Sequence, residues 1–185
     1  MRINRSGFTI VELVVVIFVI GILAGITLIA YNGVQARTRD DRRKTDVENI
    51  EKAMELYYSD NGSYPVPTGS TGSVINPAWY SSDDSSWDML SGLLVGSQAI
   101  DALPVDPINT ANKSPLTAGN YGYAVFVNST GSYCGAGRGQ MYLIVYRLEG
   151  MPKERKSDGP CTTNALGDNY YDSGASYYRN TKSGS

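Results

Sequence analysis

The sequence predicts an α+β fold in which one long N-terminal helix, a membrane span plus an amphipathic stalk, packs on a small antiparallel sheet head. Three observations lead to this prediction. Residues 8–31 form an apolar run, residues 34–60 contain neither proline nor glycine, and the chain beyond Gly62 becomes rich in glycine, serine, proline and tyrosine. One long helix followed by several strands is typical of a sheet that buries one face against the helix.

The apolar run of 24 residues is long enough to cross the ~30 Å hydrocarbon core of a bilayer. Arg2 and Arg5 precede it, which favours a cytoplasmic N-terminus and an exported C-terminal part. Five basic residues in the segment 37–44 oppose that orientation by a simple count. We interpret this segment as a solvated helix face neutralised by neighbouring acids; lipid headgroup or DNA binding is the alternative.

Glu12 is the only charged residue of the run. A carboxylate inside a membrane-spanning stretch costs roughly 2.5–3.5 kcal/mol on insertion scales, so it indicates a nearby cation or a function. The segment supplies no cation. Cleavage between Gly7 and Phe8 would create one, because the freed α-amine of Phe8 lies four residues before Glu12 on the same helix face.

Gly7 followed by Phe-Thr-Ile-Val-Glu12 and an aliphatic helix resembles the N-terminal signal of type IV prepilins and pseudopilins. The resemblance implies the pilin fold, cleavage after Gly7 by a prepilin peptidase, N-methylation of Phe8, and a role for Glu12 in seating each subunit in a filament. It covers about 50 residues. Many type IVa pilins have a proline in the second half of the apolar run, and here the first proline is Pro65.

The helix is expected to continue into a stalk. Apolar positions from Val47 to Tyr58 recur at spacings of three, four and seven, which predicts an amphipathic stripe. Asn61, Gly62 and Pro65 supply a stop signal. We therefore predict a leader at 1–7, a transmembrane and filament-core helix at 8–31, an amphipathic stalk helix at 32–59, and a globular head at 60–185. A helix from 8 to 59 would be roughly 78 Å long.

Within the span, Gly21 and Gly25 form a G-x-x-x-G pair, which permits close helix approach or simply weakens the helix. In the head, residues 65–86 read as a connection anchored by Trp79, Tyr80 and Trp87. We expect a short helix at 87–100 with its leucines and Met89 on one side, and strands at 121–127 and 140–148. Residues 153–159 suit a turn, and the tail from Asp168 suits an edge strand or a loose surface segment.

Composition excludes several classes of function. The chain has no histidine, which removes Ser-His-Asp catalysis, imidazole metal sites and the usual pH switch. The net charge is −2, and −4 without Arg2 and Arg5, which argues against nucleic acid as a primary partner. Cys134 and Cys161 are the only cysteines; in an exported head they predict a disulfide, with two unpaired thiols as the alternative. The resemblance makes 134–161 a candidate for the cysteine-closed loop of pilins.

Few residues of the head suggest chemistry. The loop around Asp106 resembles a loop of major pseudopilins linked to calcium, so Asp101, Asp106 and Asn109 are weak candidate ligands, but their spacing matches no strong calcium motif. We predict no cofactor. Asp83 and Asp84 could form a carboxylate pair, yet their serine-rich setting indicates a solvated loop, and we predict that the protein is not an enzyme.

The resemblance and the residues together predict a structural subunit of a type IV pilus-like filament, used for adhesion, motility or DNA uptake. A pseudopilin of a type II secretion or competence system is the alternative, and a signal-anchored extracellular binding module is the second one. The expected partners are further copies of the chain in a helical homopolymer, the prepilin peptidase, the inner-membrane assembly platform and, before assembly, membrane lipid. The surface ligand cannot be named from the sequence.

Overall fold

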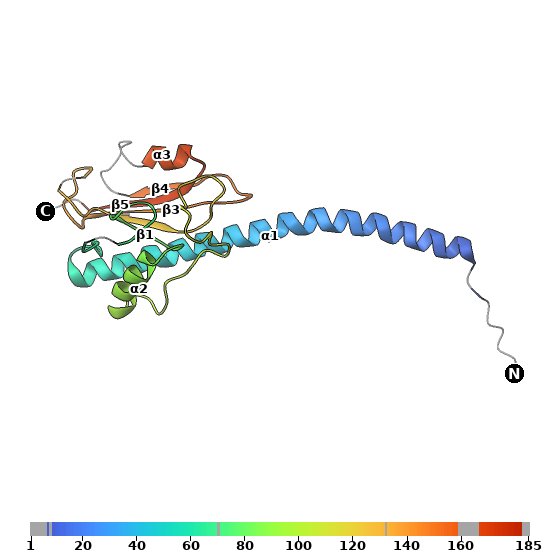
Figure 1. Ribbon diagram of the computed structural model, residues 1–185, viewed down its shortest axis with the longest axis horizontal. Helices are drawn as coiled ribbons and strands as arrows, with labels where there is room; N and C mark the ends of the chain where they lie inside the picture. Colours follow the sequence, from blue (N-terminus) through green and yellow to red (C-terminus); the bar gives the residue numbers. More distant parts are fainter. Residues whose placement is uncertain (1–6, 8, 70, 132, 159–166, 183–185) are drawn as a thin grey trace.

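The computed structural model describes residue 7 and residues 9–69, 71–131, 133–158 and 167–182, with only the backbone described at 26–32, 158 and 167–169. Figure 1 shows a long helix whose first half stands clear of a head built around a sheet. The elements in chain order are α1 (Ile10–Asn61), β1 (Trp79–Ser81), α2 (Ser86–Gly96), β2 (Ala124–Val127), β3 (Met141–Tyr146), β4 (Arg155–Asp158), α3 (Gly167–Asp172) and β5 (Ser176–Thr181). The α+β prediction is confirmed.

Helix α1 is one unbroken helix of 52 residues, as the absence of proline predicts. It begins after Thr9 and ends at Gly62, whose positive φ of 70° places it in the left-handed region that glycine tolerates. The Gly62 amide donates to the carbonyl of Tyr58, which closes the last turn at 2.8 Å. Only the second half of α1 contributes to the head, through a buried stripe of Val47, Ile50, Ala53 and Met54.

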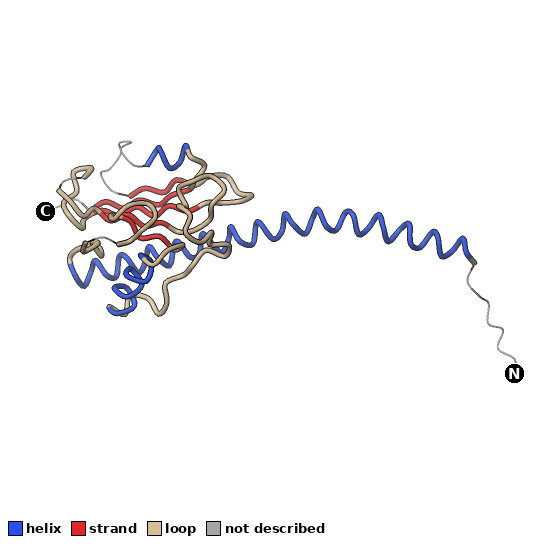
Figure 2. Tube along the Cα trace, in the orientation of Figure 1, coloured by secondary structure: helices blue, strands red, loops and turns tan. Residues whose placement is uncertain are grey.

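The five strands form one sheet in the order β1-β2-β3-β5-β4. All neighbouring pairs are antiparallel except β4 and β5, which are parallel. Two expectations are wrong here. Residues 155–158 form a strand of the sheet, drawn in red in Figure 2, where a turn was expected. Strand β5 lies between β3 and β4 rather than at an edge.

The sheet is covered on both faces, whereas the sequence predicted one buried face. Alternate residues of β3 divide between two clusters because successive side chains point to opposite faces. Tyr142 and Ile144 pack with α1 and α2. Leu143 and Val145 pack on the other face, against a cluster that includes Tyr170 and Tyr171 of α3. The core of the head is therefore a layer on each side of one sheet.

The short helix predicted at 87–100 is confirmed as α2, but the face it buries differs. Leu90 and Leu94 are buried, while Met89 and Leu93 remain 37% and 39% exposed. Trp87 is buried as expected, and its indole N–H donates to the carbonyl of Pro104 at 3.1 Å. Trp79 is also buried, within β1, a three-residue strand that the sequence did not suggest.

Candidate functional site

The first part of α1 exposes apolar side chains around its whole circumference. Every side chain from 10 to 25 is exposed, and twelve large apolar ones retain 47% to 82% of their accessible surface. We call this segment, residues 10–25, the apolar arm. Burying a large apolar side chain contributes about 1.5–3 kcal/mol, so covering the arm is worth on the order of 10 kcal/mol or more. A helix that is apolar on all sides is found buried in lipid or protein.

Among the residues that the structure describes, no helix is both long enough and apolar enough to cross a membrane.

Thr9 and Glu12 form a reciprocal cap at the start of the arm. The backbone N–H and the hydroxyl of Thr9 both donate to Glu12 Oε2, at 2.8 and 2.7 Å. The Glu12 amide in turn donates to the Thr9 hydroxyl oxygen at 3.3 Å. This is a capping box, and the carboxylate also lies favourably at the positive end of the helix dipole. The carboxylate of Glu12 is thus held by its own chain while its side chain stays exposed.

The expected cleavage point lies just before this cap. Gly7 is exposed, in non-helical backbone, and a side chain at its position would meet nothing within 4 Å. Phe8, the expected new N-terminus and methylation site, lies outside the described residues. Gly7, on one side of the expected cleavage point, is therefore accessible.

The arm carries a shallow apolar groove of about 470 Å³ at Gly21, lined also by Val14, Ile17, Phe18 and Ile22. A Cβ added to Gly21 or Gly25 would meet nothing within 4 Å. Neither glycine is therefore required by packing within the chain. Helix α1 nevertheless remains regular through both of them.

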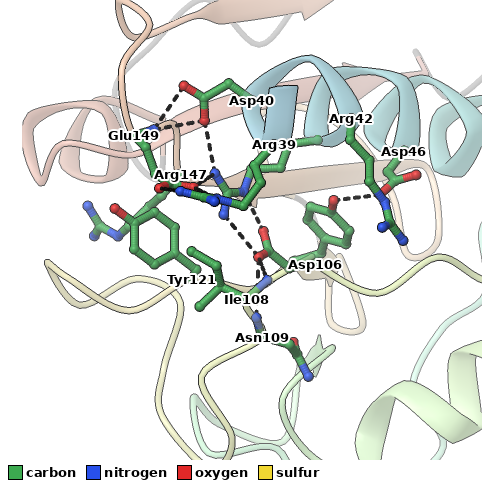
Figure 3. Close-up of polar contacts among 12 residues, drawn as sticks. Arg39, Asp40, Arg42, Asp46, Asp106, Ile108, Asn109, Tyr121, Arg147 and Glu149 are labelled. Atoms are coloured by element: carbon green, nitrogen blue, oxygen red, sulfur yellow. Dashed lines mark hydrogen bonds and ion pairs between the residues drawn. The ribbon is translucent and has the colours of Figure 1, made fainter. Parts of the chain in front are cut away.

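A second group of polar residues lies where α1 enters the head, and we call Arg39, Asp40, Arg43, Asp106 and Glu149 the neck cluster. Figure 3 labels all of them except Arg43. Arg43 is fully buried at its centre. Its guanidinium donates to Asp106 Oδ2 at 2.7 Å, to Asp40 Oδ1 at 2.9 Å and to Glu149 Oε1 at 2.6 Å. The cluster joins the stalk to the 101–109 loop and to the turn after β3.

Several further contacts satisfy the neck cluster. Arg39 pairs with Glu149, with its Nε 2.8 Å from Oε1. The Asp40 carboxylate accepts backbone N–H groups of residues 149–151 at 2.8 to 3.1 Å. The Tyr121 ring lies 4.6 Å from the Arg43 guanidinium, which suits a cation–π contact. Buried charges persist when they are paired and hydrogen-bonded in this way.

The charges of the neck cluster shift one another's pKa. Burial alone would lower the pKa of Arg43, but its bonds to Asp106 and Glu149 raise that pKa above the usual range. The pKa of Glu149 is lowered, chiefly by its hydrogen bond from Arg39. Both groups are charged at neutral pH. The expectation of a solvated basic segment is therefore wrong for Asp40 and Arg43, while Arg37 is exposed as expected.

The weak metal candidates are placed as follows. Asp106 is engaged by Arg43 and also accepts the backbone amides of Ile108 and Asn109, at 2.8 and 3.3 Å. The Asn109 side chain exchanges hydrogen bonds with Ser82. Asp101 is exposed. In the described part of the chain, no group of three or more acidic, cysteine or histidine residues could hold a metal ion.

The remaining predicted positions are only partly described. Cys134 takes part in a disulfide, while Cys161 lies outside the described residues. Asp83 is 6% exposed, not solvated as expected; it contacts the Ser81 hydroxyl, and burial raises its pKa. Asp84 accepts the backbone amides of Val74 and Ser86, each at 2.8 Å, and so shapes the loop before α2.

Sequence reasoning overlooked two features. Thr9 and Glu12 stand three residues apart at the start of the apolar run, which is the local signature of a capping box. The capping box could therefore have been predicted from the sequence. The neck cluster could not, since Arg43 contacts Asp106 and Glu149 only through the tertiary fold.

The exposed arm and its capped glutamate form the N-terminal segment that carries the resemblance to prepilins. Residues 2–28 match the model of the prokaryotic N-terminal methylation motif, which confirms the resemblance based on Gly7 and Glu12. The match thus covers residues 2–7 of the expected leader, the cap and the apolar arm.

The N-terminal part of the chain is also similar to named relatives. It is 31% identical over 73 residues to the type II secretion system core protein G of Aeromonas hydrophila, covering 40% of this chain and 51% of the relative. It is 33% identical over 78 residues to the type IV major pilin protein PilE1 of Neisseria gonorrhoeae, covering 42% of this chain and 47% of the relative. It is 38% identical over 68 residues to the fimbrial protein EcpC of Eikenella corrodens, covering 37% of this chain and 44% of the relative. The chain spans about half the length of these relatives, and no solved structure matches it.

Proposed function

We propose that this chain is a structural subunit of a type IV pilus-like filament, cut after Gly7, methylated at Phe8 and assembled through its N-terminal helix. The observation that carries the proposal is the apolar arm, a fully exposed helix continuous with a stalk that packs on a folded head. An arm of this kind is stable only in lipid or among other helices. The proposed uses of the filament are adhesion, motility or DNA uptake, and the role of the chain is structural rather than catalytic.

The precursor inserts its apolar run, residues 8–31, into the membrane with the N-terminus in the cytoplasm. The prepilin peptidase then frees the α-amine of Phe8, and the inner-membrane assembly platform brings processed copies together. The apolar arms leave the lipid, pack against one another and form the core of a filament. Repeated head-to-tail contacts do not close on themselves, so growth is open-ended.

Glu12 acts in this scheme as the polar contact of the filament core. Its carboxylate is exposed and already partly satisfied by Thr9, which reduces the penalty of placing it in an apolar setting. The α-amine created by cleavage then supplies the Glu12 carboxylate with a cationic partner. Assembly thereby depends on prior processing.

A pseudopilin of a secretion or competence system is the second candidate. The relatives include core protein G of type II secretion systems, and the apolar run lacks a helix-kinking proline. Both candidates share the arm, the cleavage and the filament. Imaging of the sheared surface fraction separates them, because a pilus extends from the cell and is released by shear.

The test replaces Glu12 by alanine in cells that express the peptidase and the assembly platform. We expect the precursor to insert and to be processed normally, with filaments reduced at least about tenfold, since burying an unpaired α-amine is strongly unfavourable. Glu48→Ala, at an exposed acid on the stalk, is the matched control and should assemble as the parent does. Normal filaments from the Glu12 variant would contradict the proposal.

A further inference from the structure

A small polar pocket lies at the end of α1 that is farthest from the apolar arm. It has a volume of about 340 Å³ and is lined by Tyr57, Ser63, Tyr64, Val66 and Arg138; we call it the distal pocket. Figure 1 shows that the last residues of α1 lie at the opposite side of the molecule from its first residues. The pocket is therefore remote from the segment proposed to insert and assemble.

One wall of the distal pocket is a rigid turn that carries Arg138. Gly139 has a φ of 70°, and a Cβ there would lie 2.9 Å from the Ser63 Cβ, so only glycine fits. The Gly139 carbonyl accepts the Tyr64 amide at 2.8 Å, and the Gly139 amide donates to the Asn128 carbonyl at 2.8 Å. The buried Asn128 side chain also donates to the carbonyls of residues 131, 136 and 137.

The same turn is fastened to the end of α1 by Gln140. The side-chain oxygen of Gln140 accepts a hydrogen bond from the Tyr58 hydroxyl at 2.5 Å, and its side-chain Nε2 donates to the Gly62 carbonyl at 3.0 Å. The backbone on both sides of Arg138 is thus fixed by hydrogen bonds, while the Arg138 side chain is exposed. A fixed backbone reduces the ordering cost of a ligand contact.

Three hydrogen-bonding groups of the distal pocket have no partner among the described residues. They are the Arg138 guanidinium, the Ser63 hydroxyl and the Tyr57 hydroxyl. The Tyr64 hydroxyl, in contrast, is engaged and donates to Glu55 at 2.7 Å. The lining of the pocket therefore includes three residues with unengaged hydrogen-bonding groups, one of which is the half-buried Tyr57.

We propose that the distal pocket binds an acidic saccharide unit, a sugar ring that carries one carboxylate. The planar guanidinium of Arg138 matches a carboxylate in a two-bond geometry. The Ser63 and Tyr57 hydroxyls suit ring hydroxyl groups, and the Tyr57 ring offers an apolar face to the ring carbons. Arg138 is the single cation among the lining residues, and the nearby Glu55 is paired with Lys182 at 2.9 Å. One guanidinium balances one negative charge, so a monoanion is preferred over a dianion such as phosphate. This proposal does not depend on filament formation.

The experiment titrates the full chain in detergent micelles with glucuronate, glucose, acetate and inorganic phosphate, and follows binding by saturation-transfer NMR and calorimetry. We expect glucuronate to bind at least about tenfold more tightly than the other three, since only it supplies both the carboxylate and the ring. Arg138→Gln should weaken glucuronate binding about 10- to 100-fold, and Ser63→Ala by several-fold. Arg37→Gln, at an exposed arginine of the stalk, should leave it unchanged.

Each contrary outcome overturns a defined part of the proposal. No binding of glucuronate, or equal binding by the Arg138 variant, shows that the pocket is not the site. Equal affinity for acetate shows that the sugar ring contributes nothing, and tighter binding of phosphate replaces the saccharide by a plain anion. The thermal unfolding of both variants should equal that of the parent, which separates lost binding from lost structure.

Discussion

Replacing Arg43 by methionine tests whether the neck cluster holds the head to the stalk. The substitution keeps much of the side-chain length and removes the charge, which leaves Asp40 and Asp106 without their shared guanidinium. Breaking a buried ion pair by removing one partner costs about 3–5 kcal/mol. Both carboxylates keep backbone N–H donors, so we expect the lower end, about 3 kcal/mol. For a domain of this size that corresponds to a fall in Tm of roughly 6–12 °C.

The assay is urea unfolding of the full chain in detergent micelles, followed by tryptophan fluorescence. Trp79 and Trp87 are 2% and 4% exposed, so their emission reports on the head. Arg42→Met is the matched control. The Arg42 side chain is 61% exposed and lies 3.6 Å from Asp46, and a surface pair of this kind contributes about 0.5 kcal/mol or less.

Two results would refute this reasoning. The first is a loss of stability below about 1 kcal/mol at pH 7. The second is a loss equal to that of Arg42→Met, because an exposed pair and a buried network would then contribute alike.

Three further predictions concern the head. Arg39 and Arg43 lower the folded-state pKa of Glu149. The contribution of Glu149 to the free energy of unfolding is therefore present above its unfolded pKa of about 4.3 and is lost as pH falls through the folded value. Glu149→Gln should flatten the dependence of stability on pH below about pH 5, and an unchanged slope would refute this. Gly139→Ala should cost about 1–3 kcal/mol in urea unfolding, since its Cβ would lie 2.9 Å from the Ser63 Cβ, whereas Gly137→Ala should be nearly neutral. Finally, non-reducing mass spectrometry should find Cys134 joined to Cys161, with reduction costing about 3–4 kcal/mol; a free thiol would exclude that pairing.

Local signals predicted much of the fold. The length of α1 followed from the lack of proline and from the apolar stripe that starts at Val47, and β2 and β3 followed from their β-branched and aromatic residues. Strand β4 was missed because its sequence, Arg-Lys-Ser-Asp, has no apolar alternation; it is a strand only because it pairs with β5. Strand β5 was misplaced at an edge because its neighbours in the sheet are chosen by tertiary pairing.

The candidate site divides in the same way. The proposed cleavage glycine Gly7, the capped glutamate and the apolar arm lie close together in the sequence, so local patterns indicate them. The burial of Arg43 depends on carboxylates 63 and 106 residues away, and the distal pocket joins Arg138 to the end of α1. Contacts of that range are set by the packing of the sheet on the stalk, and local patterns do not encode them.

We propose that cleavage after Gly7 allows the apolar arm to form a filament core. The most direct test is the intact mass of the chain recovered from the sheared, sedimentable fraction of expressing cells. The account predicts a chain that begins at Phe8, with or without a methyl group, in particles that contain many copies. An uncut chain in that fraction, or a processed chain found only as monomers in the membrane, would contradict it.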